Sequence, residues 1–307
     1  MDSVKTILIT GASGALGREL AYYLSILQQK IIPTSRDYNS GFYLDVSDLK
    51  SLHSFLKEKQ PDLIIHLAAM VPIALVEQNH DGAIATNIAG LDNTLNSVKH
   101  SCPQAKVIVT SSSEVYGNGN YGKKFEETDP YSPNNLYAFT KVAQEELSKL
   151  YVKNGLNIKI ARIFNYSSIY KKPVYSLESF ANQIAEIIKK GGEKRITVGD
   201  LRPERDFLNG QDVASALIAI AMNQSPHTVF NVCRGSTVSM ESLLKSMVKE
   251  FGTPIDIQED PTKLRTIDNY YVCGDNSRLL SLGWVPRIDV DKMIKILVGH
   301  YKKLYSV

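Results

Sequence analysis

The chain has 307 residues, of which 43% are hydrophobic and 22% are charged, and its formal net charge is +3. This is an ordinary globular composition, and so small a charge gives no reason to expect nucleic acid or a membrane surface as a partner. Cys102, Cys233 and Cys273 lie far apart, which argues against a disulfide framework and favours a reducing compartment. No apolar run approaches a membrane span, and no signal-peptide pattern opens the chain, so we expect a cytoplasmic protein.

Short runs rich in β-branched residues alternate with helical patterns through the first half of the chain. The predicted strands are 4–10, 30–36, 61–69, 106–112 and 156–165. The predicted helices are 18–29, 46–59, 82–100 and 137–155. Strands that alternate with helices at these lengths indicate an α/β protein with a parallel, doubly wound sheet of the Rossmann type.

The regular alternation of predicted strands and helices ends after about residue 166. A long polar loop is followed by an amphipathic helix over 179–191, and a second loop leads into a helix that ends near residue 222. We therefore expect a nucleotide-binding domain over 1–166, with a returning segment near 209–232. A smaller C-terminal α/β substrate domain is expected over 167–307.

A glycine-rich turn joins the first predicted strand to the first predicted helix. Gly11, Gly14 and Gly17 have the spacing G-x-x-G-x-x-G. Glycines at such a junction let the backbone approach a pyrophosphate, which the amide hydrogens and the helix dipole then hold. The turn therefore predicts a dinucleotide site.

The end of the second predicted strand is where the adenosine ribose is usually recognised. Ser35 and Arg36 stand there, and Arg18 follows the third glycine. Two guanidinium groups and a hydroxyl suit a 2′-phosphate, which favours NADP. Asp37 keeps NAD as an alternative, since a carboxylate would bind the 2′-hydroxyl and repel a phosphate.

Two further features are open to more than one interpretation. Asp45 and Val46 suit the adenine edge, but Asp45 or Ser47 could equally cap the next helix. Tyr137 and Lys141 are four residues apart, which puts them on one helix face, where the ammonium would favour the phenolate. That pair suits a proton donor, although an ordinary surface helix carries it as well.

Taken together, the motifs resemble those of the extended short-chain dehydrogenase/reductase family, in the same order and over essentially the whole chain. The matching segments are GASGALG (11–17), LDVSD (44–48), HLAA (66–69), Asn87, SSSEVYG (111–117), YAFTK (137–141), RIFN (162–165) and RDF (205–207). The resemblance implies that Tyr137 is the general acid/base. It also implies that Lys141 lowers the pKa of Tyr137 and holds the nicotinamide ribose, while Ser112 binds the reacting oxygen.

The same resemblance implies the rest of the site and no metal. The implied cofactor site comprises Gly11, Ser13, Gly14, Leu16, Gly17, Ser35, Arg36, Asp45, Val46, Leu67, Ala68, Ala69, Asn87, Tyr137, Lys141 and Phe164. The implied substrate site comprises Ser113, Glu114, Asn165, Arg205, Arg265 and Asp268.

The C-terminal half resembles the group of GDP-6-deoxy-D-mannose reductases, which implies NADP-linked reduction of the C4 keto group of a nucleotide-linked 4-keto-6-deoxy sugar, with GDP as the favoured nucleotide. Tyr166 and the stretch SSIYKK depart from the pattern of nucleotide-sugar enzymes and leave the sugar open. A 4-epimerase with tightly bound NAD is the main alternative. Dehydration, with Glu114 as the base, ranks third, and a non-enzymatic NADP-binding protein last. The family also implies a homodimer through two long helices per subunit, one of them the helix of YAFTK.

Overall fold

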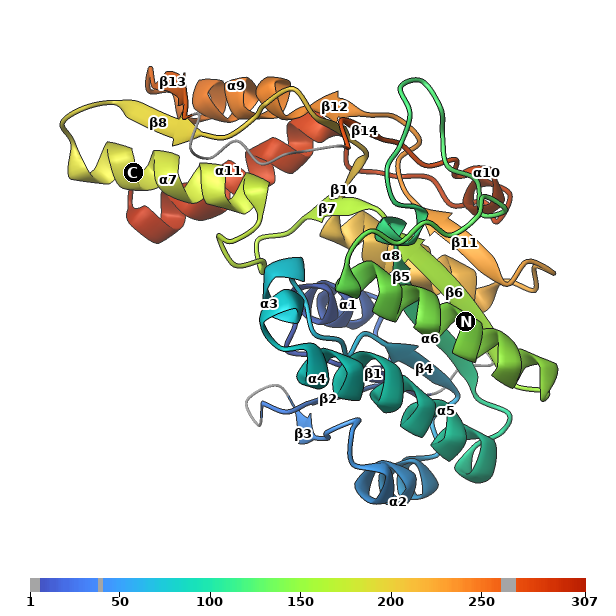
Figure 1. Ribbon diagram of the computed structural model, residues 1–307. Helices are drawn as coiled ribbons and strands as arrows, with labels where there is room; N and C mark the ends of the chain where they lie inside the picture. Colours follow the sequence, from blue (N-terminus) through green and yellow to red (C-terminus); the bar gives the residue numbers. More distant parts are fainter. Residues whose placement is uncertain (1–5, 38–40, 261–268) are drawn as a thin grey trace.

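The computed structural model describes residues 6–37, 41–260 and 269–307 (Figure 1). The predicted substrate residues Arg265 and Asp268 lie outside the described residues. Within the described ranges, no helix is long and apolar enough to cross a membrane.

A seven-stranded parallel sheet forms the centre of the larger half, with the strand order β11-β6-β5-β4-β1-β2-β3. Its strands are β1 Ile7–Thr10, β2 Ile31–Ser35, β3 Phe42–Tyr43, β4 Leu63–His66, β5 Lys106–Ser112, β6 Asn157–Ile163 and β11 Val229–Val232. The inner strands β1 and β4 are buried along their whole length, which explains their continuous apolar sequence. The predicted doubly wound fold is confirmed.

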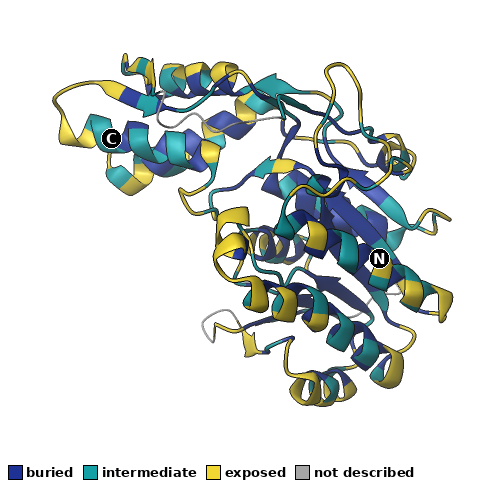
Figure 2. Ribbon diagram, in the orientation of Figure 1, coloured by how far each residue is buried: buried dark blue, intermediate teal, exposed yellow. Residues whose placement is uncertain are grey.

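Helices cover both faces of this sheet. On one face α1 Ala15–Ile26 packs against α8 Gly210–Met222, and the other face carries α2 Leu49–Lys59, α5 Gly90–Ser101 and α6 Leu136–Lys153. Figure 2 shows the buried strands enclosed between helices whose outer sides are exposed. Because α1, α6 and α8 all follow or flank the carboxyl ends of strands, their N-termini approach one edge of the sheet.

The predicted helix over 82–100 is not one regular helix. A short helix α4 His80–Ala83 leads into a π-helical turn η2 Ile84–Ala89, and α5 follows. A further short helix, α3 Ile73–Gln78, lies within a segment for which we predicted no element. The N-cap of α2 also differs from expectation, since Asp48 accepts a hydrogen bond from the Ser51 backbone at 3.1 Å, while Asp45 instead binds Ser47.

The smaller half has its own hydrophobic core between helices and short strands. Its helices are α7 Ser176–Lys190, α9 Met240–Phe251 and α11 Val290–Tyr305. Its strands are β8 Arg195–Val198, β9 Glu204–Arg205, β12 Val238–Ser239, β13 Asp256–Glu259 and β14 Tyr271–Val272. Figure 1 shows these elements gathered at one end of the molecule, beyond the sheet.

The chain crosses between the two halves several times. The pair β7 Asn165–Ser167 and β10 Phe207–Asn209 joins them, and α8 and β11 return to the large core. The short helix α10 Ser277–Leu280 and Trp284 also pack there. The division at residues 166 and 167, with a returning segment near 209–232, is retained as a proposal.

Candidate active site

The glycine-rich turn lies where β1 ends and α1 begins. Gly11 has φ +68°, and a Cβ there would come 2.9 Å from the backbone nitrogen of Ala68. A Cβ on Gly17 would come 2.6 Å from the Cα of Ala12. Only glycine fits these two approaches, and the resulting turn presents the first backbone amides of a 12-residue helix at the sheet edge.

The other predicted residues of this region have different surroundings. Ser13 is half-buried, Gly14 is exposed as the N-cap of α1, and Leu16 packs into the large core. Leu67, Ala68 and Ala69 are half-buried immediately after β4. Because β1 and β4 are parallel neighbours, residues 67–69 lie beside the glycine-rich turn.

The residues expected to read the adenosine ribose lie at the end of β2. Ser35 is buried, and its hydroxyl accepts from the Asp37 backbone at 3.0 Å. Arg36 and Asp37 are exposed. Arg18 donates to the Ser13 carbonyl at 3.1 Å, so its guanidinium lies against the glycine-rich turn. An accessible cation is therefore available on each side of the expected ribose position.

Asp45 and Val46 lie further along the same edge. Asp45 is half-buried and holds Ser47, while Val46 is buried against Gly90, whose Cα leaves no space for a Cβ. The Val46 carbonyl accepts from the Asn93 side chain at 3.1 Å. This segment is thus anchored to α5, and its Asp45 carboxylate remains partly accessible.

Ser112, Tyr137 and Lys141 come together where β5 ends and α6 begins. Ser112 is the last residue of β5, and its hydroxyl caps Glu114 at 3.2 Å and hydrogen bonds to the Tyr137 phenol. Lys141 Nζ lies 5.8 Å from the centroid of the Tyr137 ring. Asn135 caps α6 by accepting from the Ala138 backbone at 2.8 Å, so the helix starts just before the tyrosine.

The expected lowering of the Tyr137 pKa by Lys141 is not found. Burial raises the pKa of Tyr137, the hydrogen bond from Ser112 opposes this rise, and nearby Glu114 adds to it. The Lys141 ammonium donates to the Thr110 carbonyl at 2.8 Å and to Gln144 Oε1 at 2.9 Å. The lysine is therefore directed at the end of β5 as well as towards the phenol, and the low polarity of the site dominates.

Asn87 has no accessible surface and links the π-helical turn to α6. Its Oδ1 accepts from the Met70 backbone at 2.6 Å, and its Nδ2 donates to Thr140 Oγ1 at 3.1 Å. π-helical turns occur often at functional sites because they leave a backbone carbonyl free of its usual partner. The Asn87 side chain thus ties the π-helical turn to α6 and to the segment after β4.

The predicted substrate residues Glu114 and Arg205 interact electrostatically with each other. Glu114 accepts weakly from Asn135 at 3.4 Å, burial raises its pKa, and the charge of Arg205 opposes that rise. Arg205 is held by the Asn269 carbonyl at 2.6 Å. Glu114 thus acts electrostatically on Tyr137, and Arg205 acts on Glu114, whereas Ser113 is buried in the turn after β5.

The predicted residues Phe164 and Asn165 have different surroundings. Phe164 is buried in a small cluster with Val115 and Cys233. Asn165 begins β7 and is exposed.

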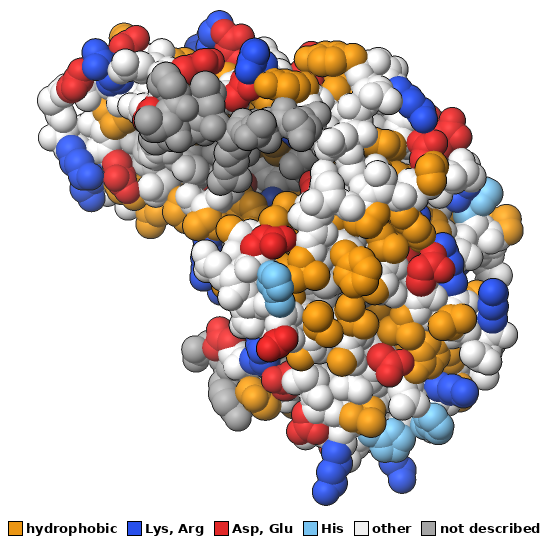
Figure 3. Space-filling model, viewed as in Figure 1, with side chains coloured by type: hydrophobic (Ala, Val, Ile, Leu, Met, Phe, Trp, Pro, Cys, Tyr) orange, Lys and Arg blue, Asp and Glu red, His pale blue; other side chains and the backbone are white. Residues whose placement is uncertain are grey.

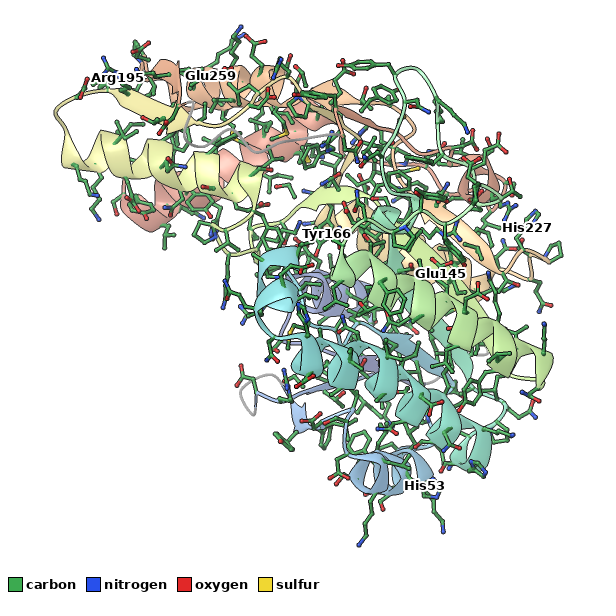
Figure 4. All side chains as sticks on the ribbon, in the orientation of Figure 1. His53, Glu145, Tyr166, Arg195, His227 and Glu259 are labelled. Carbon is green, nitrogen blue, oxygen red and sulfur yellow. The ribbon has the colours of Figure 1, made fainter. Side chains whose placement is uncertain are left out.

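Tyr166 and the stretch SSIYKK, noted above as departures from the nucleotide-sugar pattern, include Lys171, to which sequence reasoning gave no role of its own. Lys171 donates to the Tyr166 carbonyl at 2.6 Å and lies 3.7 Å from the Tyr166 ring centroid and 4.5 Å from that of Tyr175. Burial lowers the pKa of Lys171 to about 8. Figure 4 shows Tyr166 at the junction of the two halves. Gln144, the direct partner of Lys141, was also missed; its place three residues after the lysine is the signal that could have found it.

Comparison with known proteins agrees with this geometry. A family model described as "GDP-mannose 4,6 dehydratase" matches residues 8–297, and the chain belongs to this family. It is 28% identical over 302 residues to the GDP-6-deoxy-D-mannose reductase of Pseudomonas aeruginosa, covering 96% of this chain and 97% of that protein. It is 27% identical over 308 residues to a putative UDP-glucose 4-epimerase of Methanocaldococcus jannaschii, covering 96% and 98%.

Among solved structures, that of RMD from Pseudomonas aeruginosa complexed with NADPH superposes with a TM-score of 0.89 at 26% identity, covering 98% of this chain and 99% of the other. The resemblance to extended short-chain dehydrogenases/reductases that the motifs predict is therefore confirmed.

Proposed function

We propose that the protein catalyses NADP-linked reduction of the C4 keto group of a nucleotide-linked 4-keto-6-deoxy sugar, with GDP as the favoured nucleotide. The observation that carries the proposal is the meeting of Ser112, Tyr137 and Lys141 beside the glycine-rich turn. The similarity to a GDP-6-deoxy-D-mannose reductase supports the choice of substrate.

In this mechanism a bound dihydronicotinamide supplies hydride to the sugar C4. Tyr137 donates its phenolic proton to the C4 oxygen as negative charge develops there, and the Ser112 hydroxyl orients that oxygen. Tyr137 is protonated before the reaction, because the pKa of a phenol is ordinarily about 10 and burial raises it further; the phenolate formed on proton donation therefore needs stabilisation. Lys141 stabilises the phenolate that is left and has a third donor for the nicotinamide ribose.

The cofactor preference for NADP rests on Arg18 and Arg36. Both are exposed beside the glycine-rich turn and the end of β2, where a 2′-phosphate would lie. The NADPH named for the superposed Pseudomonas aeruginosa structure supports this choice, and NAD stays the alternative.

A homodimer through α5 and α6 is also proposed. Exposed apolar side chains occur on and beside these helices, including Phe139 at 53%, Leu150 at 56% and Ile84 at 45% exposure. Figure 3 shows hydrophobic side chains gathered on this face of the molecule. Apolar patches of this kind are typical of interaction surfaces.

The first test is consumption of reduced cofactor. The protein is mixed with GDP-4-keto-6-deoxymannose and either NADPH or NADH, and absorbance of the reduced cofactor is followed. We expect NADPH to disappear rapidly, and Tyr137→Phe to lose at least about 99% of turnover, the lower end of the range for one proton-transfer group, while still binding NADPH. Tyr22→Phe, at an exposed tyrosine of α1, is the matched control and should keep full activity.

A second candidate is 4-epimerisation of a nucleotide sugar, which the similarity to a putative UDP-glucose 4-epimerase favours. It would use the same Ser112 and Tyr137. Tightly bound NAD in the purified protein, with no net consumption of NADPH, would replace the reductase proposal by this one.

A further inference from the structure

Two consecutive polar residues on the buried side of α6 have no accessible surface. Gln144 and Glu145 follow Lys141 by three and four positions, so all three lie on one helix face. Both side chains are completely enclosed, although neither belongs to the set that carries the proposed reaction. Buried polar groups are costly unless every one of them is paired, so their partners indicate what they do.

Gln144 joins Lys141 to the π-helical turn. Its Oε1 accepts from Lys141 Nζ at 2.9 Å, and its Nε2 donates to the Asn87 carbonyl at 2.5 Å. An ammonium has three donors, and the Thr110 carbonyl takes a second one at 2.8 Å. With two donors fixed by Gln144 and Thr110, the third has a defined direction.

Glu145 joins α6 to the end of β5 and to β6. Its Oε1 accepts from the Ser111 hydroxyl at 2.5 Å, and Arg162 Nη2 donates to Oε2 at 2.8 Å. The Tyr131 hydroxyl donates to Oε2 at 2.8 Å. Ser111 directly precedes Ser112, so this carboxylate also holds the strand end that carries the reacting hydroxyl. Figure 4 shows Glu145 on α6 at the face of the sheet.

Few charges face Lys141. Glu145 faces it from the same helix, and Arg162 on β6 faces Glu145 from the other side. On β4, His66 is buried and neutral because burial and Lys141 lower its pKa to about 3. Burial lowers the pKa of Lys141 to about 8, and the Glu145 carboxylate opposes that loss of charge.

We propose that Gln144 and Glu145 are positioning residues for the proposed reductase reaction: Gln144 fixes where the Lys141 ammonium points, and Glu145 keeps it charged and fixes Ser111 and Ser112. This inference rests on the proposed function, but the protonation state of Lys141 can be measured without keto-sugar reduction.

The test changes the charge beside Lys141 in both directions. Glu145→Gln removes the opposing carboxylate, so the lysine loses its proton at lower pH. Gln144→Glu adds a carboxylate at hydrogen-bond distance, so the proton is held to higher pH. We expect opposite shifts of about one pH unit each, measured as the titration of the Lys141 side chain by lysine-labelled NMR and as the alkaline limb of the pH profile for keto-sugar reduction.

The controls separate charge from packing. Glu146→Gln alters the next residue, an exposed carboxylate paired with Lys149, and should shift neither readout. Ser111→Ala removes an uncharged donor from the Glu145 carboxylate without changing the number of charges beside Lys141, and should lower turnover without moving the alkaline limb. If Glu145→Gln does not fold because Arg162 is left unpaired, Gln144→Glu alone decides the matter.

An unchanged Lys141 titration in Gln144→Glu, or shifts of the same sign in both variants, would overturn the inference. A wild-type protein that reduces no keto sugar would overturn the proposed function instead, while the NMR titration would still test the roles of Gln144 and Glu145.

Discussion

The two halves of the molecule hold their shape by different means. In the larger half, β1, β4 and β5 are parallel neighbours in continuous register, and the expected site residues stand at their carboxyl ends. In the smaller half the strands have two to four residues, and buried side chains connect distant segments. Backbone ladders therefore place the strand ends that carry the proposed catalytic groups, with Glu145 as an added support, whereas the expected substrate-binding segments depend mainly on buried carboxylates.

Asp206 is the clearest of these carboxylates. It is fully buried and accepts from the backbone nitrogens of Arg234 at 2.7 Å, Gly235 at 2.9 Å and Gly274 at 3.4 Å. Asp212 does the same for Arg287 and Ile288, at 3.0 Å each. A single side chain thus fixes segments that are far apart in the sequence, so the smaller half should be more sensitive to single polar substitutions.

The largest effect is expected from Asp206→Ala. Its backbone donors would be left buried without an acceptor, which should lower the free energy of unfolding by about 3–5 kcal/mol. Urea denaturation followed by fluorescence measures it. Glu241→Ala, which breaks an ion pair between the exposed side chains of Glu241 and Lys245, is the control and should cost no more than about 1 kcal/mol. Equal losses in the two variants would contradict the role of Asp206.

Gly11→Ala tests the larger half at the point where the glycine-rich turn lies against the backbone of Ala68. The new Cβ would require a left-handed conformation and a contact of 2.9 Å with Ala68, at a cost of about 1–3 kcal/mol. We expect weaker NADPH binding by calorimetry, since the glycine-rich turn must move. Gly122→Ala, with a similar φ of +75° but open space around it, isolates the backbone strain from the clash. If Gly11→Ala left the affinity for NADPH unchanged, the proposed binding of the cofactor at the glycine-rich turn would be disproved.

Arg36→Ala should alter cofactor selectivity without affecting the fold. Loss of one guanidinium near a 2′-phosphate should weaken the binding of NADPH by about tenfold, or about 1.4 kcal/mol, and should weaken the binding of NADH far less. Affinities for both cofactors measure the effect. An equal loss for NADPH and NADH would remove the reason for preferring NADP.

A pH dependence of stability also separates the halves. Burial raises the pKa of Asp206 to about 6, from an ordinary value of about 3.9. Between these values the native state binds more protons than the unfolded state, so this group lowers stability as pH rises through the window. Burial lowers the pKa of His66 to about 3, so its contribution to stability instead increases as pH rises, over an overlapping pH range. The free energy of unfolding is measured against pH for the wild type and for Asp206→Asn, and the difference isolates the Asp206 contribution. The same slope of stability against pH in both proteins would contradict the raised pKa.

Much of the site was predictable because its residues lie at fixed sequence distances. The glycine spacing follows from one strand-to-helix turn, and Tyr137 and Lys141 share a face because a helix repeats every 3.6 residues. The π-helical turn around Asn87 was not predictable, since its local sequence reads as an ordinary helix. The packing of Phe164 was not predictable either, because residues from distant segments enclose its side chain.

By itself the sequence determined the alternation of strands and helices, through periodicity, and the family, through its motifs, and it named the proposed reacting groups, because periodicity and motif spacing are local properties. Only the tertiary structure decided which way Lys141 points, why burial raises the pKa of Tyr137, and that Gln144 and Glu145 enclose the lysine. The physical reason is that burial and hydrogen-bond partners come from β4, β5, β6 and the π-helical turn, which approach α6 only after the chain has folded.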